Sequence, residues 1–306
     1  MGLGTALAEL IDDPEAFETV LADGFRRLAD DAYAAEQERV APGSGQVIGV
    51  RWPLIRAVAR QLRTPFREAS SSSAISLAQH LSGSPIREIR LFAHEPLARS
   101  LVDDPERTWQ VIRRLARQAT DWTSTDSLAS LVANGIVREP FRWAELEQLV
   151  YSDRPFERRL VGATLATMPF RFPRGARSSL PGERGLQLIG SLMGDADEWV
   201  QKALGWALRS WSQVDADGVT RFLLDQADRA ARADDGHRAW VVRDALAGQP
   251  PRIAAGVRQT LAGVRRRADA PSTSDAAAIA AEFAAALGSA DRAVAQQGER
   301  MAAARR

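Results

Sequence analysis

The chain of 306 residues has no cysteine, which excludes disulfide bonds, thiol nucleophiles and zinc sites with cysteine ligands. Histidine is also scarce. His80, His94 and His237 lie far apart in the sequence and form no metal-ligand spacing with nearby carboxylates. Phosphate-binding loops and nucleophile elbows are missing as well, and the segment GSGQVIG lacks the preceding strand that a dinucleotide site needs. We therefore expect no metal and no cofactor.

Long apolar runs are absent too, because no stretch approaches the roughly 18 residues that a membrane-spanning helix requires. The first residues, MGLGTALAELIDDPEAFE, lack a basic segment and turn acidic where a signal peptide turns apolar. These features predict a protein that does not associate with membranes. We expect it in the cytoplasm.

Lysine is nearly absent, since Lys202 is the only one and every other basic residue among the 40 is arginine. The planar guanidinium fits phosphate oxygens, although codon usage in a GC-rich genome would also favour arginine. Net charge is only +1, so the overall balance does not indicate a nucleic-acid partner. The 45% hydrophobic and 26% charged content is typical of a globular protein.

Apolar residues recur with helical spacing along the chain, and no convincing β-alternation appears. Predicted helices span 14–38 and 65–81, and others begin at Trp52, Ser84 and Asp104. Further starts fall near Asp121, Arg142, Arg154, Gly182, Asp195 and Asp215. Helix pairs therefore recur at about 40 residues, a period typical of a HEAT-like α-solenoid of antiparallel helix pairs. We expect one such domain over 1–268 and an alanine-rich helical extension of unassigned role over 269–306.

Trp122 and Asp126 are four residues apart, which places an indole and a carboxylate on the same face of a helix. Such a pair would surround a transient cation with negative charge and an aromatic wall. Three further segments also have a recognisable sequence motif. They are GVRWPLIR (49–56), EIRLFA (88–93) and QKALGWALR (201–209).

Together with WTSTD (122–126), these segments resemble the AlkD branch of the DNA alkylation repair proteins, which are HEAT-like DNA glycosylases. They are similar to its patterns G-V-R-x-P-x-L-R, E-x-R-x-x-A, W-D-x-V-D and Q-K-A-x-G-W-x-L-R, in the same order. Phe156-Glu157-Arg158-Arg159 falls where the family has an arginine at the head of a helix. The resemblance covers roughly residues 30 to 230.

The resemblance implies an all-α fold with a concave DNA-binding face and a monofunctional alkylpurine DNA glycosylase. Its substrate would be double-stranded DNA containing cationic N3- or N7-alkylated purines, processed without drawing the base into a deep pocket. The role implied is base excision repair, or self-resistance to a DNA-alkylating natural product. We expect the protein to be a monomer in the bacterial cytoplasm, and to lie at the nucleoid when it is bound to DNA.

The same resemblance implies the roles of individual residues. Asp126 would stabilise the positive charge that develops on the deoxyribose, and Trp122 and Trp206 would offer aromatic faces around one concavity. Arg159 would hold a flanking phosphate. Further DNA contacts are expected from Arg158, Lys202, Arg209, Arg51 and Arg90.

Alternatives remain for several of these residues. Thr123 stands where the family often has Asp, and Asp121 is a second candidate carboxylate on a different helix face. Tryptophans at helical spacing are commonly core residues, and arginines are commonly solvated. A non-catalytic HEAT-like scaffold and a protein that binds alkylated DNA without cleaving it are the alternative functions.

Overall fold

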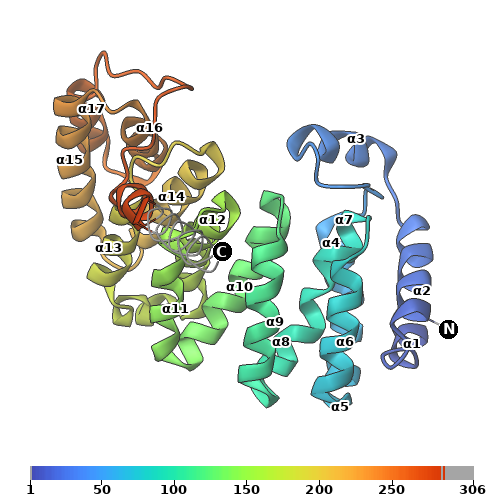
Figure 1. Cartoon of the computed structure of the whole chain (residues 1–306). Helices are drawn as coiled ribbons and strands as arrows, with labels where there is room; N and C mark the ends of the chain where they lie inside the picture. Colours follow the sequence, from blue (N-terminus) through green and yellow to red (C-terminus); the bar gives the residue numbers. More distant parts are fainter. Residues whose placement is uncertain (1, 284, 287–306) are drawn as a thin grey trace, which may run out of the picture. The chain divides into compact units, whose positions relative to one another are not determined.

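The computed structural model describes residues 2–283 and 285–286, and these fold mainly into helices (Figure 1). Within this described part, the only β-type pairing is an isolated parallel bridge between Gln46 and Ile86. The prediction of an all-α, solenoid-like fold is therefore confirmed. No helix in the same residues is long and apolar enough to cross a bilayer.

The chain divides into two compact units. Unit 1 comprises 1–144 and 163–173, and unit 2 comprises 145–162 and 174–306. In a solenoid each helix packs mainly on its neighbours, so a chain can separate into such units without a linker. The division falls inside the predicted 1–268 domain, and that single-domain organisation stays a prediction.

Unit 1 begins with ten helices in sequence order. They are α1 (Leu3–Ala8), α2 (Pro14–Arg26), α3 (Asp31–Val40), α4 (Trp52–Gln61), α5 (Arg63–Glu68), α6 (Ser71–Ser82), α7 (Arg87–Phe92), α8 (His94–Asp103), α9 (Pro105–Gln118) and α10 (Trp122–Arg138). Short 3-10 turns follow at η1 (Pro140–Arg142) and η3 (Met168–Arg171). The core near the N-terminus is aromatic: the ring centroids of Phe17 and Phe92 lie 6.3 Å apart, and Phe25 meets Phe92 edge-on at 6.1 Å.

Three of the predicted long helices are broken. The helix expected over 14–38 is α2 and α3, because Asp30 caps a new helix by accepting a hydrogen bond from the Tyr33 amide. The helix expected over 65–81 is α5 and α6, and Ser70 is the cap. The helix expected from Ser84 is α7 and α8, separated at Ala93. At the first two breaks, capping side chains thus override continuous apolar periodicity.

Unit 2 contains the later helices. They are the main part of α11 (Trp143–Gln148), η2 (Leu149–Tyr151), the first part of α12 (Pro155–Thr167), η4 (Arg174–Ser179), α13 (Gly182–Leu192), α14 (Glu198–Trp211), α15 (Ala216–Ala233), α16 (Gly236–Ala245), η5 (Leu246–Gly248) and α17 (Pro251–Thr260). Helices α14 and α16 lie side by side (Figure 1). Gly205 permits this approach, because a Cβ there would lie 2.0 Å from the Asp244 carboxylate.

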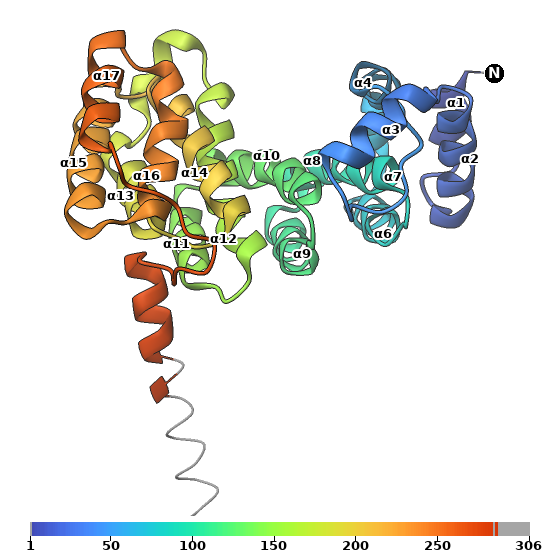
Figure 2. The same cartoon turned by 90° about the horizontal axis from the view of Figure 1, so that it is seen from above.

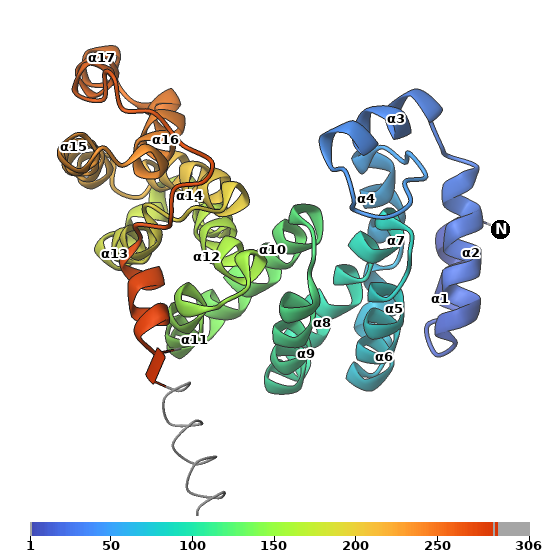
Figure 3. The same cartoon turned by 45° about the horizontal axis from the view of Figure 1, so that its top comes forward.

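The start of the C-terminal extension packs against unit 2. A loop from α17 passes α16 and α14 and leads into a helix over 275–283 (Figure 3). The Thr273 amide donates to the Gly194 carbonyl at 2.9 Å, and its hydroxyl donates to Asp235. Figure 2 shows this helix, in red, after the loop. Ser274 caps it by accepting a hydrogen bond from the Ala277 amide. Of the predicted extension over 269–306, residues 284 and 287–306 lie outside the described residues.

Candidate functional site

The start of α10 is capped by Asp121, one of the two candidate carboxylates. Asp121 is the N-cap, and its Oδ1 accepts from the amides of Thr123 and Ser124, both at 2.9 Å. The hydroxyls of these two residues also donate to Asp121, which is 8% exposed. Asp121, the alternative candidate carboxylate, is therefore used in holding the helix end. Thr123 supports the cap.

Asp126 lies one turn into α10, on the same face as Trp122, and both side chains are partly exposed. A cavity of about 450 Å³ lies on another side of this helix, where Asp121, Ser124 and Leu128 line it. At about 100° per residue, those three positions point roughly opposite to Trp122 and Asp126. The Trp122–Asp126 face is thus separate from the cavity.

The first two patterned segments are joined by a buried carboxylate. Glu88, on α7, is 2% exposed and accepts hydrogen bonds from the amides of Ile48, Gly49 and Val50 at 3.1, 2.7 and 3.3 Å. Gly49 has a φ of +90°, and a Cβ there would lie 2.5 Å from a backbone oxygen. The glutamate of one segment and the glycine of the other therefore fix the loop that leads into α4.

Arg51 and Arg90, both expected at DNA, differ in accessibility. The Arg51 guanidinium is exposed. Its Nη2 lies 2.7 Å from Asp30 Oδ2, and its central carbon lies 4.9 Å from the Tyr33 ring centroid. The hydrogen bond and charge of Asp30 raise the pKa of Arg51. Arg90 is more enclosed: it donates to the Ser84 carbonyl at 2.9 Å and to the Ser44 carbonyl. Arg90 thus joins two loops of unit 1, and its DNA contact stays a prediction.

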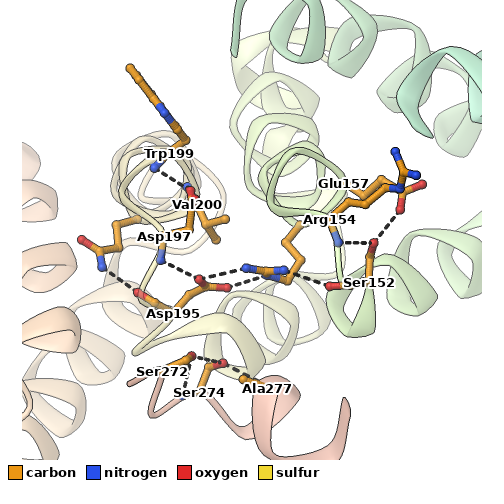
Figure 4. A network of polar contacts seen from close by, with 12 residues as sticks. Ser152, Arg154, Glu157, Asp195, Asp197, Trp199, Val200, Ser272, Ser274 and Ala277 are labelled. Atoms are coloured by element: carbon orange, nitrogen blue, oxygen red, sulfur yellow. Dashed lines mark hydrogen bonds and ion pairs between the residues drawn. The ribbon is translucent and has the colours of Figure 1, made fainter. Parts of the chain in front are cut away.

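In unit 2, Arg158 is held by a buried acid. Its Nε and Nη2 donate to the two carboxylate oxygens of Asp195 at 2.7 and 3.2 Å, and its Nη1 donates to the Ser152 carbonyl at 2.9 Å. Asp195 is 1% exposed and also accepts from the Asp197 amide (Figure 4). Ala276 and Ala277 of the extension line a cavity beside this pair. In this arrangement Arg158 joins α12 to the loop before α14.

Arg159 has a similar position. It is 5% exposed, and its Nη1 donates to the Trp199 carbonyl in the first turn of α14 at 2.6 Å. The side chain thus positions α12 against α14. A phosphate contact by Arg159 stays a prediction. It would require the phosphate to reach a buried guanidinium.

The outward face of α14 carries cations and indoles in alternation. Lys202, Trp206 and Arg209 follow Trp199 at intervals of three, four and three residues, and so lie along one side of the helix. The Lys202 ammonium sits 4.0 Å from the Trp199 ring centroid and 3.5 Å from Glu198. Trp206 is partly exposed. This face can present positive charge and an aromatic surface to a ligand.

Arg209 contributes less freely, because its guanidinium donates to both the carboxylate and the carbonyl of Asp244 on α16. Gln201, in the same segment, is fully buried and donates to the Asp195 carbonyl at 2.6 Å. The nine-residue pattern QKALGWALR therefore combines an accessible face with residues that assemble unit 2. Resemblance to the family pattern identified the segment but did not separate these roles.

The predicted site residues thus fall into two groups. Trp122 and Asp126 share a face of α10 in unit 1, whereas Arg158, Arg159 and Trp206 belong to unit 2. The expectation that Asp126 and both indoles surround one concavity stays a prediction. Across the described residues, no group of His, Asp or Glu side chains has a metal-binding arrangement.

Comparison with known proteins agrees with the segments described above. The model of the family described as DNA alkylation repair enzyme matches residues 21–246. A solved structure described as a predicted DNA alkylation repair enzyme from Enterococcus faecalis superposes with a TM-score of 0.59 and 13% identity. The match covers 73% of this chain and 97% of that one, and at this identity it shows a shared fold. Among curated proteins, none matches the chain. With its family match over most of its length, the chain belongs to the DNA alkylation repair enzyme family.

Proposed function

We propose that this repair enzyme is a monofunctional DNA glycosylase that hydrolyses the N-glycosidic bond of cationic N3- or N7-alkylated purines in duplex DNA. The observation that carries the proposal is the arrangement of the two acids at the start of α10. Asp121 is used as the cap, so the partly exposed carboxylate on the Trp122 face is that of Asp126. Repair of alkylated DNA is the role that family membership supports.

The chemistry follows from the charge of the lesion. An alkylated purine cation leaves with the electron pair of the glycosidic bond and becomes a neutral base, so no general acid is needed. Positive charge then grows on the deoxyribose, where a nearby carboxylate stabilises it. Water adds its oxygen to C1′ and gives a proton to Asp126 or to solvent. The products are the free base and an abasic site.

Neighbouring groups would hold the DNA while this happens. The Trp122 indole offers its face to the cationic base or sugar, an attraction of about 0.5–2 kcal/mol. Trp206 and Lys202 on α14 offer an aromatic surface and a charge to the same substrate. Such contacts require no deep base pocket, and bulky cationic adducts fit this scheme as well as methyl groups do.

The test is single-turnover release of 7-methylguanine from a duplex, measured for the wild type and for Asp126→Asn together with DNA affinity. Rapid release by the wild type, reduced about 100-fold or more in the variant, supports the proposal. Binding without release in either protein would instead identify a reader of alkylated DNA. No binding even at low salt would identify a scaffold.

A further inference from the structure

Three successive arginines, Arg265, Arg266 and Arg267, follow α17 in a part of the chain beyond the family match, which ends at residue 246. All three side chains are exposed. They lie in the loop that passes α16 and α14 before the extension (Figure 3). None of the residues proposed above for DNA contact belongs to this loop.

The loop is held close to the two helices by specific contacts. A Cβ on Gly236, at the start of α16, would lie 2.1 Å from the Arg265 carbonyl oxygen, so backbone approaches backbone there. Arg243, on α16, donates to the carbonyls of Leu261 and Val264 at 2.8 and 2.9 Å. At the far end, the His237 ring bonds to the Ala270 carbonyl at 3.0 Å. The arginines are therefore presented from a fixed backbone.

Arg266 is directed toward α14, the helix that carries Lys202 and Trp206. Its Nη1 donates to Gln201 Oε1 at 3.0 Å, and its guanidinium lies 5.7 Å from the Trp240 ring centroid on α16. Gln201 directly precedes Lys202. The Arg266 charge is thus placed beside the first turns of α14, and a flat guanidinium stacked on an indole keeps donors available for a ligand.

Charge in this loop is only partly balanced by acids. Arg267 pairs with Asp234 at 3.2 Å, and Lys202 with Glu198 at 3.5 Å. In the described part of the chain, Arg265 and Arg266 have no carboxylate partner, and the Arg265 side chain donates only to the neighbouring Val264 carbonyl, at 3.5 Å. Burial lowers the pKa of Arg243, and the nearby positive charge of Arg265 lowers it further.

We propose that Arg265 and Arg266 bind phosphates of the DNA backbone. They would add a second group of phosphate contacts in unit 2, next to the α14 face. The ligand is the sugar-phosphate backbone of the same duplex, so the inference rests on the DNA substrate of the proposed function. Exposed guanidinium groups without acid partners on a fixed loop suit phosphate oxygens and carry no base specificity.

The experiment measures the affinity of the full chain for undamaged and 7-methylguanine duplexes over a range of salt concentrations. Each phosphate contact contributes about −0.9 to the slope of log affinity against log salt. We expect Arg265→Gln and Arg266→Gln each to reduce the slope by about that amount, equally for both duplexes. The control is Arg258→Gln, at another exposed arginine that lies on α17 and outside the loop, and this variant should leave the slope unchanged.

Slopes of Arg265→Gln and Arg266→Gln equal to that of the control would overturn the proposal. If Arg266→Gln loosens the loop, as a lowered Tm would show, Arg265→Gln decides the question. Single-turnover excision at saturating protein separates this inference from the proposed function. A wild type that fails to excise while the slopes still fall disproves the glycosylase alone, and normal excision with unchanged slopes disproves the arginine surface alone.

Discussion

Single residues show where sequence patterns identify a site and where they stop. The Trp122–Asp126 spacing predicted a shared helix face. Helix α10 begins at Trp122, so both residues belong to it. The choice between Asp121 and Asp126 required the cap geometry, because N-cap and first-turn acids look alike in sequence. The burial of Arg159 was also beyond the sequence, since its partner is a backbone carbonyl 40 residues later.

His94 provides a test at this scale. It is the first residue of α8, lines the unit 1 cavity, and burial lowers its pKa to about 4. Protonation therefore favours the unfolded chain between its ordinary pKa near 6.5 and about 4. The free energy of unfolding should fall by about 1–3 kcal/mol as pH drops through this window.

Urea unfolding of unit 1 at pH 7.5 and pH 5, followed for wild type and His94→Gln, measures this difference. The variant should lose less stability than the wild type on acidification. Parallel losses in both proteins would show that other groups cause the acid sensitivity.

At the scale of elements, the sequence predicted most helix starts correctly but joined helices that capping residues separate. Asp30 and Ser70 lie inside apolar periodic stretches, and only their side-chain bonds to Tyr33 and Ser73 reveal the breaks. The link between the GVRWPLIR and EIRLFA segments was likewise invisible, because Glu88 reaches backbone amides about 40 residues earlier. Both segments were identified by resemblance, and their connection is structural.

Replacing Glu88 by Gln tests that connection. The change removes the charge that three amides share, and we expect a loss of about 1–3 kcal/mol in the stability of unit 1. Glu183→Gln, on the exposed side of α13, should change stability by less than about 0.5 kcal/mol. Equal effects in urea unfolding would mean that the Glu88 carboxylate does not hold the loop.

Helix packing in unit 2 depends on glycine at α13. A Cβ on Gly185 would lie 2.1 Å from the ring of Trp211, which is fully buried and bonded through Nε1 to the Gly182 carbonyl at 2.9 Å. Gly185→Ala should therefore destabilise the protein by about 1–3 kcal/mol despite the better helix propensity of alanine.

Gly256→Ala, on α17, is the matched control, because a Cβ there meets nothing within 4 Å. That substitution should stabilise the chain by up to about 1 kcal/mol. Urea midpoints that shift in the same direction for both variants would contradict the packing account.

At the scale of the whole molecule, the all-α, solenoid-like fold and the family were predictable because helical periodicity and four ordered segments extend over much of the chain. The division into two units was not predictable, since no linker composition marks it. The packing of Thr273 and Ser274 onto unit 2 was missed for a related reason: short polar residues in a sequence resemble a break. The loop that carries Arg265, Arg266 and Arg267 was not predicted to bind DNA, because it lies outside the segments that resemble the family.

The central claim is that the Asp126 carboxylate, and not that of Asp121, stabilises the sugar as its charge develops. The most direct measurement compares single-turnover release of 7-methylguanine by Asp126→Asn and Asp121→Asn at saturating protein. Asparagine remains a good N-cap, so Asp121→Asn should stay within a few-fold of the wild type. Asp126→Asn should be slower by about 100-fold or more. Equal rates for the two variants, or a larger loss in Asp121→Asn, would contradict the account.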